Sequence, residues 1–147
     1  HASTEIFSEF YTPVNTESCL ELGLTTSNET IEWWSKQTPE AQAVIKEASE
    51  TPITIREAMT NFNEWFYEER GKWIWSHGAT FDIPQLDFIN RKLGFKSPWF
   101  YSNARCTRTI FSFARDIDVE REGEHHNALD DSKYQAARLQ KIFLAAN

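Results

Sequence analysis

The chain has 147 residues, of which 40% are hydrophobic and 25% are charged. This length and composition fit one globular domain and exclude a coiled coil, a collagen and a disordered chain. Fifteen lysines and arginines stand against 22 acidic residues, which gives a net charge of −7 and argues against nucleic-acid binding through a broadly basic surface. A nuclease stays open, because a site that holds divalent cations is itself rich in carboxylates.

The sequence shows no signal for a membrane or for secretion. No run of about 18 apolar residues occurs, so no membrane-spanning helix is predicted. No secretory signal is visible, and the two cysteines, Cys19 and Cys106, are too far apart to indicate a metal motif or a disulfide framework. We therefore expect a cytoplasmic protein that contacts no membrane, and the sequence leaves a homodimer open.

The first half of the chain predicts one strand and three helices. Residues 5–14 alternate loosely and are rich in aromatic residues, which predicts a strand. Capping signals then predict helices over 26–34, 38–48 and 54–70. The last of these has apolar residues at helical spacing, and Gly71 follows as a stop signal.

The second half predicts an α/β arrangement. A short buried strand is expected over 72–76 and helices over 81–93, 107–115 and 130–146. Strands that alternate with helices indicate an α/β fold, but two strands cannot form a covered sheet. We therefore expect a single domain, 1–147, that is N-terminally incomplete, with the first strands of its sheet upstream of His1, where the chain begins without methionine.

Residues 76–82, with the sequence Ser-His-Gly-Ala-Thr-Phe-Asp, form the first cluster of chemically capable side chains. The cluster follows a predicted strand and leads through small residues into a helix, a position that suits a functional site. Asp82 is the candidate site residue. The alternative is purely structural, with Asp82 as the N-cap of the helix and Phe81 as a core anchor.

Residues 125–131, with the sequence His-His-Asn-Ala-Leu-Asp-Asp, form the second cluster. Asn127 can cap the final helix, which places His126 just before the helix and Asp131 in its first turn. A histidine beside a carboxylate suits proton transfer at neutral pH, because its ordinary pKa is about 6.5. The alternative is a solvated loop whose aspartates favour the helix dipole.

Together the two clusters resemble the DEDDh superfamily of 3′→5′ exonucleases. The second motif of that family has Phe-Asp after a strand, as residues 77–82 do, and its third has the form H-x-A-x-x-D, as residues 126–131 do. The alanine fixes the register on His126, since His125 has no alanine two residues on. The pairs at 108–109 and 33–34 also look like the small phage and bacterial branch that resembles the exonuclease DexA and its exoribonuclease-like relatives.

This resemblance, which extends from about Glu5 to the C-terminus, implies a fold and a reaction. The fold is an RNase H-like mixed sheet flanked by helices, and the reaction is metal-dependent release of nucleoside 5′-monophosphates from a single-stranded 3′ end of DNA or RNA. Asp82 and Asp131 are then two of four carboxylates that hold two Mg²⁺ or Mn²⁺ ions. His126 is the general base that deprotonates the attacking water. Asp130 and His77 are expected to hold these groups in position without binding the metal ions themselves.

The family's first motif, an Asp-x-Glu on the first strand, does not occur before Glu5, and we expect it upstream of His1. The Asp-x-Glu at 118–120 lies in a polar loop between the other two motifs and is interpreted as a decoy. Arg105 and Arg108 are candidates for phosphate contacts, although arginines exposed on a helix are the equal alternative. The competing function is a catalytically silent module of the same fold that binds nucleic acid or supports assembly.

Overall fold

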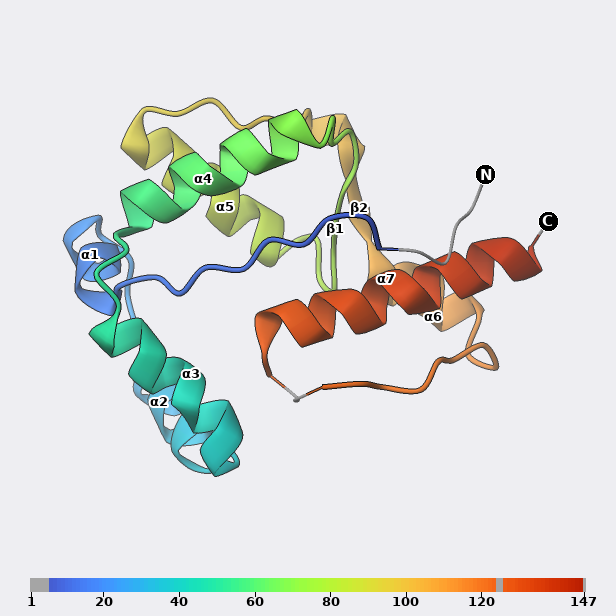
Figure 1. Cartoon of the computed structure of the whole chain (residues 1–147), viewed down its shortest axis with the longest axis horizontal. Coiled ribbons are helices and arrows are strands. Elements are labelled where there is room, and N and C mark those ends of the chain that lie inside the picture. The colour runs from blue at the N-terminus through green and yellow to red at the C-terminus, as the bar shows by residue number, and fades with distance from the viewer. Residues whose placement is uncertain (1–5, 124–125, 147) are drawn as a thin grey trace.

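The computed structural model describes residues 6–123 and 126–146. They form a mixed α/β arrangement that is mostly helical, with a small sheet of two parallel strands. Figure 1 shows α4 (Ile55–Glu68) and α5 (Asp82–Leu93) together on one side of the strands, and α6 (Thr107–Phe113) with α7 (Ala128–Ala145) on the other. Helices therefore cover the strand pair on both sides. The coarse α/β prediction is confirmed.

The predicted strand over 5–14 is wrong for the part that the structure describes. Residues 6–15 run extended, but without the hydrogen-bonded ladder of a strand. The segment is held by side chains instead, because the ring of Phe10 packs 5.6 Å from that of Trp65, and the Trp65 indole donates to Ser8 Oγ at 2.8 Å. The alternating pattern of this segment therefore reflects contacts with a neighbouring helix and not pairing with another strand.

The next three helices lie toward one end of the molecule and begin at polar caps. The caps are Asn15, Ser27 and Thr38, each of which accepts a backbone N–H through its side chain. The helices are α1 (Thr16–Glu21), α2 (Asn28–Ser35) and α3 (Pro39–Glu50). The helix α1 was not predicted, and α2 begins one residue later than the capping signal indicated.

The helix α4 confirms the predicted capping box. Thr54 accepts from the backbone N–H of Glu57, and the Glu57 carboxylate accepts from the backbone N–H of Thr54 at 2.8 Å. One side of α4 faces the core. The fully buried Asn90 of α5 accepts from Asn63 of α4 at 2.8 Å, so the packed pair of helices also shares a polar contact.

The strands are β1 (Ile74–Ser76) and β2 (Ala104–Cys106), which pair in parallel with Ser76 opposite Cys106. The strand β2 was not predicted, because three residues give too short a pattern to read. Trp73, expected to be buried beside β1, is 46% exposed, and the Arg105 guanidinium lies 4.2 Å from the centre of its ring. Burial within β1 is deepest at Ile74.

Three buried clusters fill the interior. One joins α4 to α5, a second joins α4, β1 and the segment around Trp99, and a third joins α6 to α7. Phe66 belongs to the second cluster, and its ring lies so close to Gly71 that a Cβ there would approach it within 2.7 Å. The ring therefore fills a space that the following turn leaves open.

Replacement of Phe66 by alanine should lower the free energy of unfolding by about 3–5 kcal/mol, because it removes a buried ring and leaves a cavity. Tyr67→Ala, at the adjacent position, should change it by less than about 0.5 kcal/mol, since this ring is 79% exposed. Urea unfolding followed by circular dichroism measures both. Equal losses in the two variants would contradict the assigned packing.

Candidate active site

The candidate site begins where β1 and β2 end. Because the two strands are parallel and Ser76 lies opposite Cys106, the backbone leaves both strands at the same edge of the sheet. His77 follows one strand and Thr107 the other, and His77 Nδ1 lies 3.0 Å from Thr107 Oγ1. Arg108 donates to the carbonyl of His77 at 3.1 Å. Such an edge is where open α/β sheets place their binding sites.

The turn after β1 presents Asp82 to the site. Gly78 has a φ of +135°, a value that residues with a Cβ rarely adopt, and its carbonyl accepts from the N–H groups of Phe81 and Asp82. Asp82 is the first residue of α5 rather than its cap, and Phe81 is 69% exposed. The structural alternative of an aspartate cap with a phenylalanine core anchor is therefore wrong.

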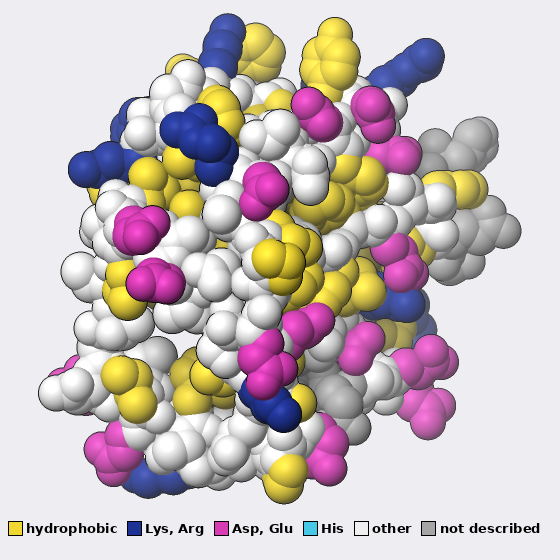
Figure 2. Space-filling view, turned by 60° about the vertical axis from the view of Figure 1, so that its left-hand side comes forward, with side chains coloured by type: hydrophobic (Ala, Val, Ile, Leu, Met, Phe, Trp, Pro, Cys, Tyr) yellow, Lys and Arg dark blue, Asp and Glu magenta, His cyan; other side chains and the backbone are white. Residues whose placement is uncertain are grey.

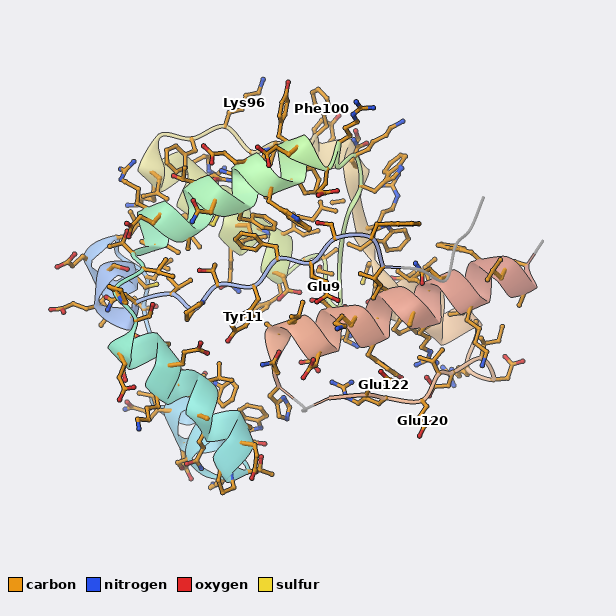
Figure 3. The ribbon with its side chains drawn as sticks, viewed as in Figure 1. Glu9, Tyr11, Lys96, Phe100, Glu120 and Glu122 are labelled. Carbon is orange, nitrogen blue, oxygen red and sulfur yellow. The ribbon has the colours of Figure 1, made fainter. Side chains whose placement is uncertain are left out.

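Asp82 lines a cavity of about 520 Å³ between α7, α4 and the strand β1. Ser76 and Thr107 also line it, as do Glu9 and Lys133, whose charged groups are 3.0 Å apart. Figure 3 shows Glu9 pointing from the extended segment toward α7. The other lining groups are mainly aromatic and aliphatic. The cavity thus combines an apolar wall with a carboxylate at the end of a strand.

The start of α7 presents His126. Asn127 caps the helix as predicted, since its side chain accepts from the N–H groups of Leu129 and Asp130. His126, immediately before the cap, is exposed and has a φ of +69°, the left-handed region that few residues other than glycine adopt. Its ring lies 4.9 Å from that of Trp33, at nearly a right angle. His125 lies outside the described residues.

Asp131 lies on a different face of α7 from the one that lines the cavity. Its carboxylate forms an ion pair with Arg121, whose guanidinium also lies 4.8 Å from the centre of the Tyr134 ring. Figure 3 shows Glu120 and Glu122 on the loop that precedes α7 and runs along this side of it, away from Glu9. The Asp130 carboxyl group lies against Gly123 in the same loop.

The predicted metal ligands do not form a complete set. Among residues 6–123 and 126–146, no three histidine, cysteine, aspartate or glutamate side chains lie close enough to share a metal ion. Asp82 lines the cavity, whereas Asp131 pairs with Arg121. The Asp-x-Glu at 118–120 has a structural role, because Asp118 accepts from the Tyr134 hydroxyl at 2.7 Å.

The candidate phosphate-binding arginines lie near the strand ends but already make local contacts. Arg105 donates to the carbonyls of Ser102 and Ala104, and it covers Trp73. Arg108 is exposed and donates to His77. Burial and the Arg108 charge lower the pKa of His77 below its ordinary 6.5, although Asp82 acts in the opposite direction. Burial and the Arg108 charge thus both favour the neutral imidazole of His77.

Sequence reasoning missed three sets of contacts at these sites. Arg121 covers Asp131, Trp33 contacts His126, and Cys106 ends β2 beside the turn that leads to Asp82. The Cys106 thiolate accepts from the backbone N–H of Ala79, and further donors at the start of α6 help to lower its pKa to about 7. The contacts between Arg121 and Asp131, between Trp33 and His126, and between Ala79 and Cys106 join separate segments of the chain, so no local motif indicated them.

The two cysteines should differ in their reaction with iodoacetamide. Cys106 should reach half its maximal rate near pH 7, because the surrounding N–H groups stabilise its thiolate. Cys19 should require a pH above 9.0, since burial raises its pKa. Mass spectrometry of peptides alkylated between pH 5 and pH 10 measures both, with Cys106→Ser as the control. A common midpoint near pH 9 would contradict the hydrogen bonds assigned to Cys106.

Comparison with known families identifies the chain's class. The family described as the Rv2179c-like 3′-5′ exoribonuclease domain matches residues 2–143, nearly the whole chain. The protein belongs to this family. No curated protein and no solved structure matches the chain. The two motif clusters described above both lie within the matched region.

No helix that the structure describes is both long enough and apolar enough to cross a bilayer.

Proposed function

We propose that this protein is a 3′→5′ exonuclease of the DEDDh type, with an RNase H-like fold, that removes nucleoside 5′-monophosphates from single-stranded nucleic acid. The family match over residues 2–143 carries the proposal. The two motif clusters support it, because each lies at the start of a helix and offers a side chain suited to phosphodiester hydrolysis. The family's description favours RNA over DNA as the substrate.

His126 is the proposed general base. Its imidazole is exposed at the entrance to α7, where a ring nitrogen can accept a proton from the attacking water. The ring also has a defined place, because Trp33 and Trp34 contact it from α2. The proton acceptor is thus held on a helix entrance rather than in a freely moving loop.

Asp82 and Asp131 are the proposed carboxylates for Mg²⁺ or Mn²⁺, which prefer oxygen ligands. The arrangement of the described residues does not itself form a two-ion site, since no three suitable ligands converge and Arg121 pairs with Asp131. The proposal therefore requires further carboxylates and release of Arg121 from Asp131. The metal dependence rests on the resemblance of the two motif clusters to the DEDDh superfamily.

A catalytically silent binding module is the second candidate. The Arg121–Asp131 ion pair favours it, because a guanidinium already neutralises one of the two carboxylates that the reaction needs. Such a module would bind single strands through the same surfaces without cutting them. The two candidates differ in turnover and agree in binding.

The polarity and metal dependence can be tested on the full-length protein. With Mn²⁺ or Mg²⁺, a 3′-labelled single strand should release labelled mononucleotides from the outset, and EDTA should stop the release. Thin-layer chromatography of the products measures both. Release from the 5′ end, or internal cuts alone, would contradict the proposed polarity, and binding without turnover would favour the silent module.

The register of the third motif can be tested with two neighbouring histidines. His126→Ala should lower kcat by at least about 100-fold, as loss of a general base does. His125→Ala should change it by less than about threefold, because the H-x-A-x-x-D pattern excludes this histidine from the role. Single-turnover kinetics with saturating metal ions measures both variants. Equal losses would show that the register is wrong.

A further inference from the structure

Cationic and aromatic side chains gather where the backbone enters β1 and β2. Because the strands are parallel and Ile74 lies opposite Ala104, the residues that precede them meet at the edge of the sheet opposite the candidate active site. The side chains at this edge form what we call the basic–aromatic surface, which consists of Lys72, Trp73, Phe100, Tyr101 and Arg105. The strand pairing thus builds two sites, one at each end.

Two cations share one indole in this surface. The Arg105 guanidinium lies 4.2 Å from the centre of the Trp73 ring, and the Lys72 ammonium lies 5.1 Å from it. Arg105 Nη1 also donates to the carbonyls of Ser102 and Ala104, at 2.7 and 2.8 Å, which holds the guanidinium against the turn before β2. Among residues 6–123 and 126–146, no hydrogen-bond acceptor pairs with its Nε or Nη2. These N–H groups are therefore available to a phosphate.

The aromatic members of the surface contribute little to the core. Tyr101 is 91% exposed and Phe100 is 72% exposed, although the neighbouring Trp99 is buried. Figure 3 shows the side chains of Phe100 and Lys96 pointing away from the body of the molecule on the same side. Single exposed rings are common on proteins. Two adjacent ones beside a pair of cations fit a surface that binds a ligand.

The charge of this surface is unusual for the protein, whose net charge is −7. Within the part of the chain that the structure describes, neither Lys72 nor Arg105 forms an ion pair with a carboxylate. The carboxylates nearest to Lys72 along the chain are Glu68 and Glu69 at the end of α4, and Glu69 lines the cavity. Figure 2 shows basic side chains near the top of the molecule beside protruding hydrophobic ones. Cations interleaved with exposed rings favour a ligand that carries both phosphates and bases.

The distance between the two edges sets the length of strand that reaches both. Trp73 and His77 are four residues apart, which corresponds to roughly 13 Å of extended backbone. A stacked strand advances about 3.4 Å per nucleotide. About four nucleotides are therefore needed to pass from the candidate active site to the basic–aromatic surface.

We propose that the basic–aromatic surface binds the body of a single strand, about four nucleotides or more upstream of the 3′ end that enters the candidate active site. The assignment rests on the proposed function, because it supplies a second contact for the same substrate. Tyr101 and Phe100 stack on bases, while Lys72 and Arg105 contact phosphates. Since neither contact reads the identity of a base, the protein should prefer long strands over short ones whatever their sequence.

Binding without hydrolysis tests the aromatic contact. A 5′-fluorescein-labelled 12-nucleotide RNA is titrated with the protein in EDTA, and fluorescence anisotropy gives Kd. Tyr101→Ala should raise Kd about fivefold or more through loss of base stacking, and Tyr101→Phe should recover most of the affinity. Phe113→Ala is the matched control, because this ring is 85% exposed on α6, outside the surface. Equal Kd values for wild type and Tyr101→Ala would overturn the assignment.

Salt dependence tests the phosphate contact in the same assay. Lys72→Gln should reduce the slope of log Kd against log salt concentration by about 0.7, the value for one phosphate contact with a single strand. Lys46→Gln removes the same charge from α3 and should leave the slope unchanged. A slope that Lys72→Gln does not alter would contradict the proposal. If Lys72→Gln instead changes the sedimentation coefficient and leaves Kd unchanged, the surface binds a second acidic copy of this chain and the proposal is wrong.

A series of RNAs from two to 12 nucleotides tests where the strand binds. Wild-type affinity should rise steeply beyond about four nucleotides, and Tyr101→Ala should flatten that rise, because shorter strands do not reach the surface. A rise that is unchanged in Tyr101→Ala would overturn the assignment. Cleavage of a dinucleotide by the wild-type protein with Mn²⁺ tests the exonuclease separately. Its absence would refute the proposed reaction, whereas the binding results would still decide the role of the surface.

Discussion

The parallel pairing of β1 with β2 is the contact on which the candidate site depends. With Ser76 opposite Cys106, the two strands release their chains at one edge, and the next residues bring together the His77–Thr107 contact, the Arg108 bond to His77 and the turn that leads to Asp82. Each strand has three residues, too few to be stable alone. Helices on both sides of the strands supply the burial that the pairing requires.

The helix α7 separates two electrostatic environments. One face lines the apolar cavity that Asp82 enters, and the other binds the preceding loop through Arg121 and Asp118. The entrance to α7 lies between them and carries His126. This protein therefore presents its proposed base beside an aromatic surface, while Arg121 pairs with one of its proposed metal carboxylates. Removal of Arg121 from Asp131 becomes a required step for any cation that binds there.

Local signals in the sequence predicted local structure well. The caps at Thr38, Thr54 and Asn127 act within three residues of themselves, so the sequence alone sufficed to locate them. The strand β2 was missed, and the strand predicted over the first residues is wrong because residues 6–15 are extended without a partner. A strand exists only where another segment pairs with it, and the sequence of one segment does not show that partner. The same distinction between local and long-range contacts applies to the candidate site. The motifs around Asp82 and His126 were legible, whereas the contacts of Arg121 with Asp131 and of Trp33 with His126 join distant segments that no pattern connects.

The central claim is that water attacks the terminal phosphodiester and that the nucleotide leaves with its 5′-phosphate. Digestion of a single-stranded RNA in water enriched in ¹⁸O, followed by mass spectrometry of the released mononucleotides, tests this most directly. The account predicts nucleoside 5′-monophosphates that each carry one solvent oxygen on phosphorus. Products with a 3′-phosphate or a 2′,3′-cyclic phosphate would contradict it, because they would show a different bond being broken.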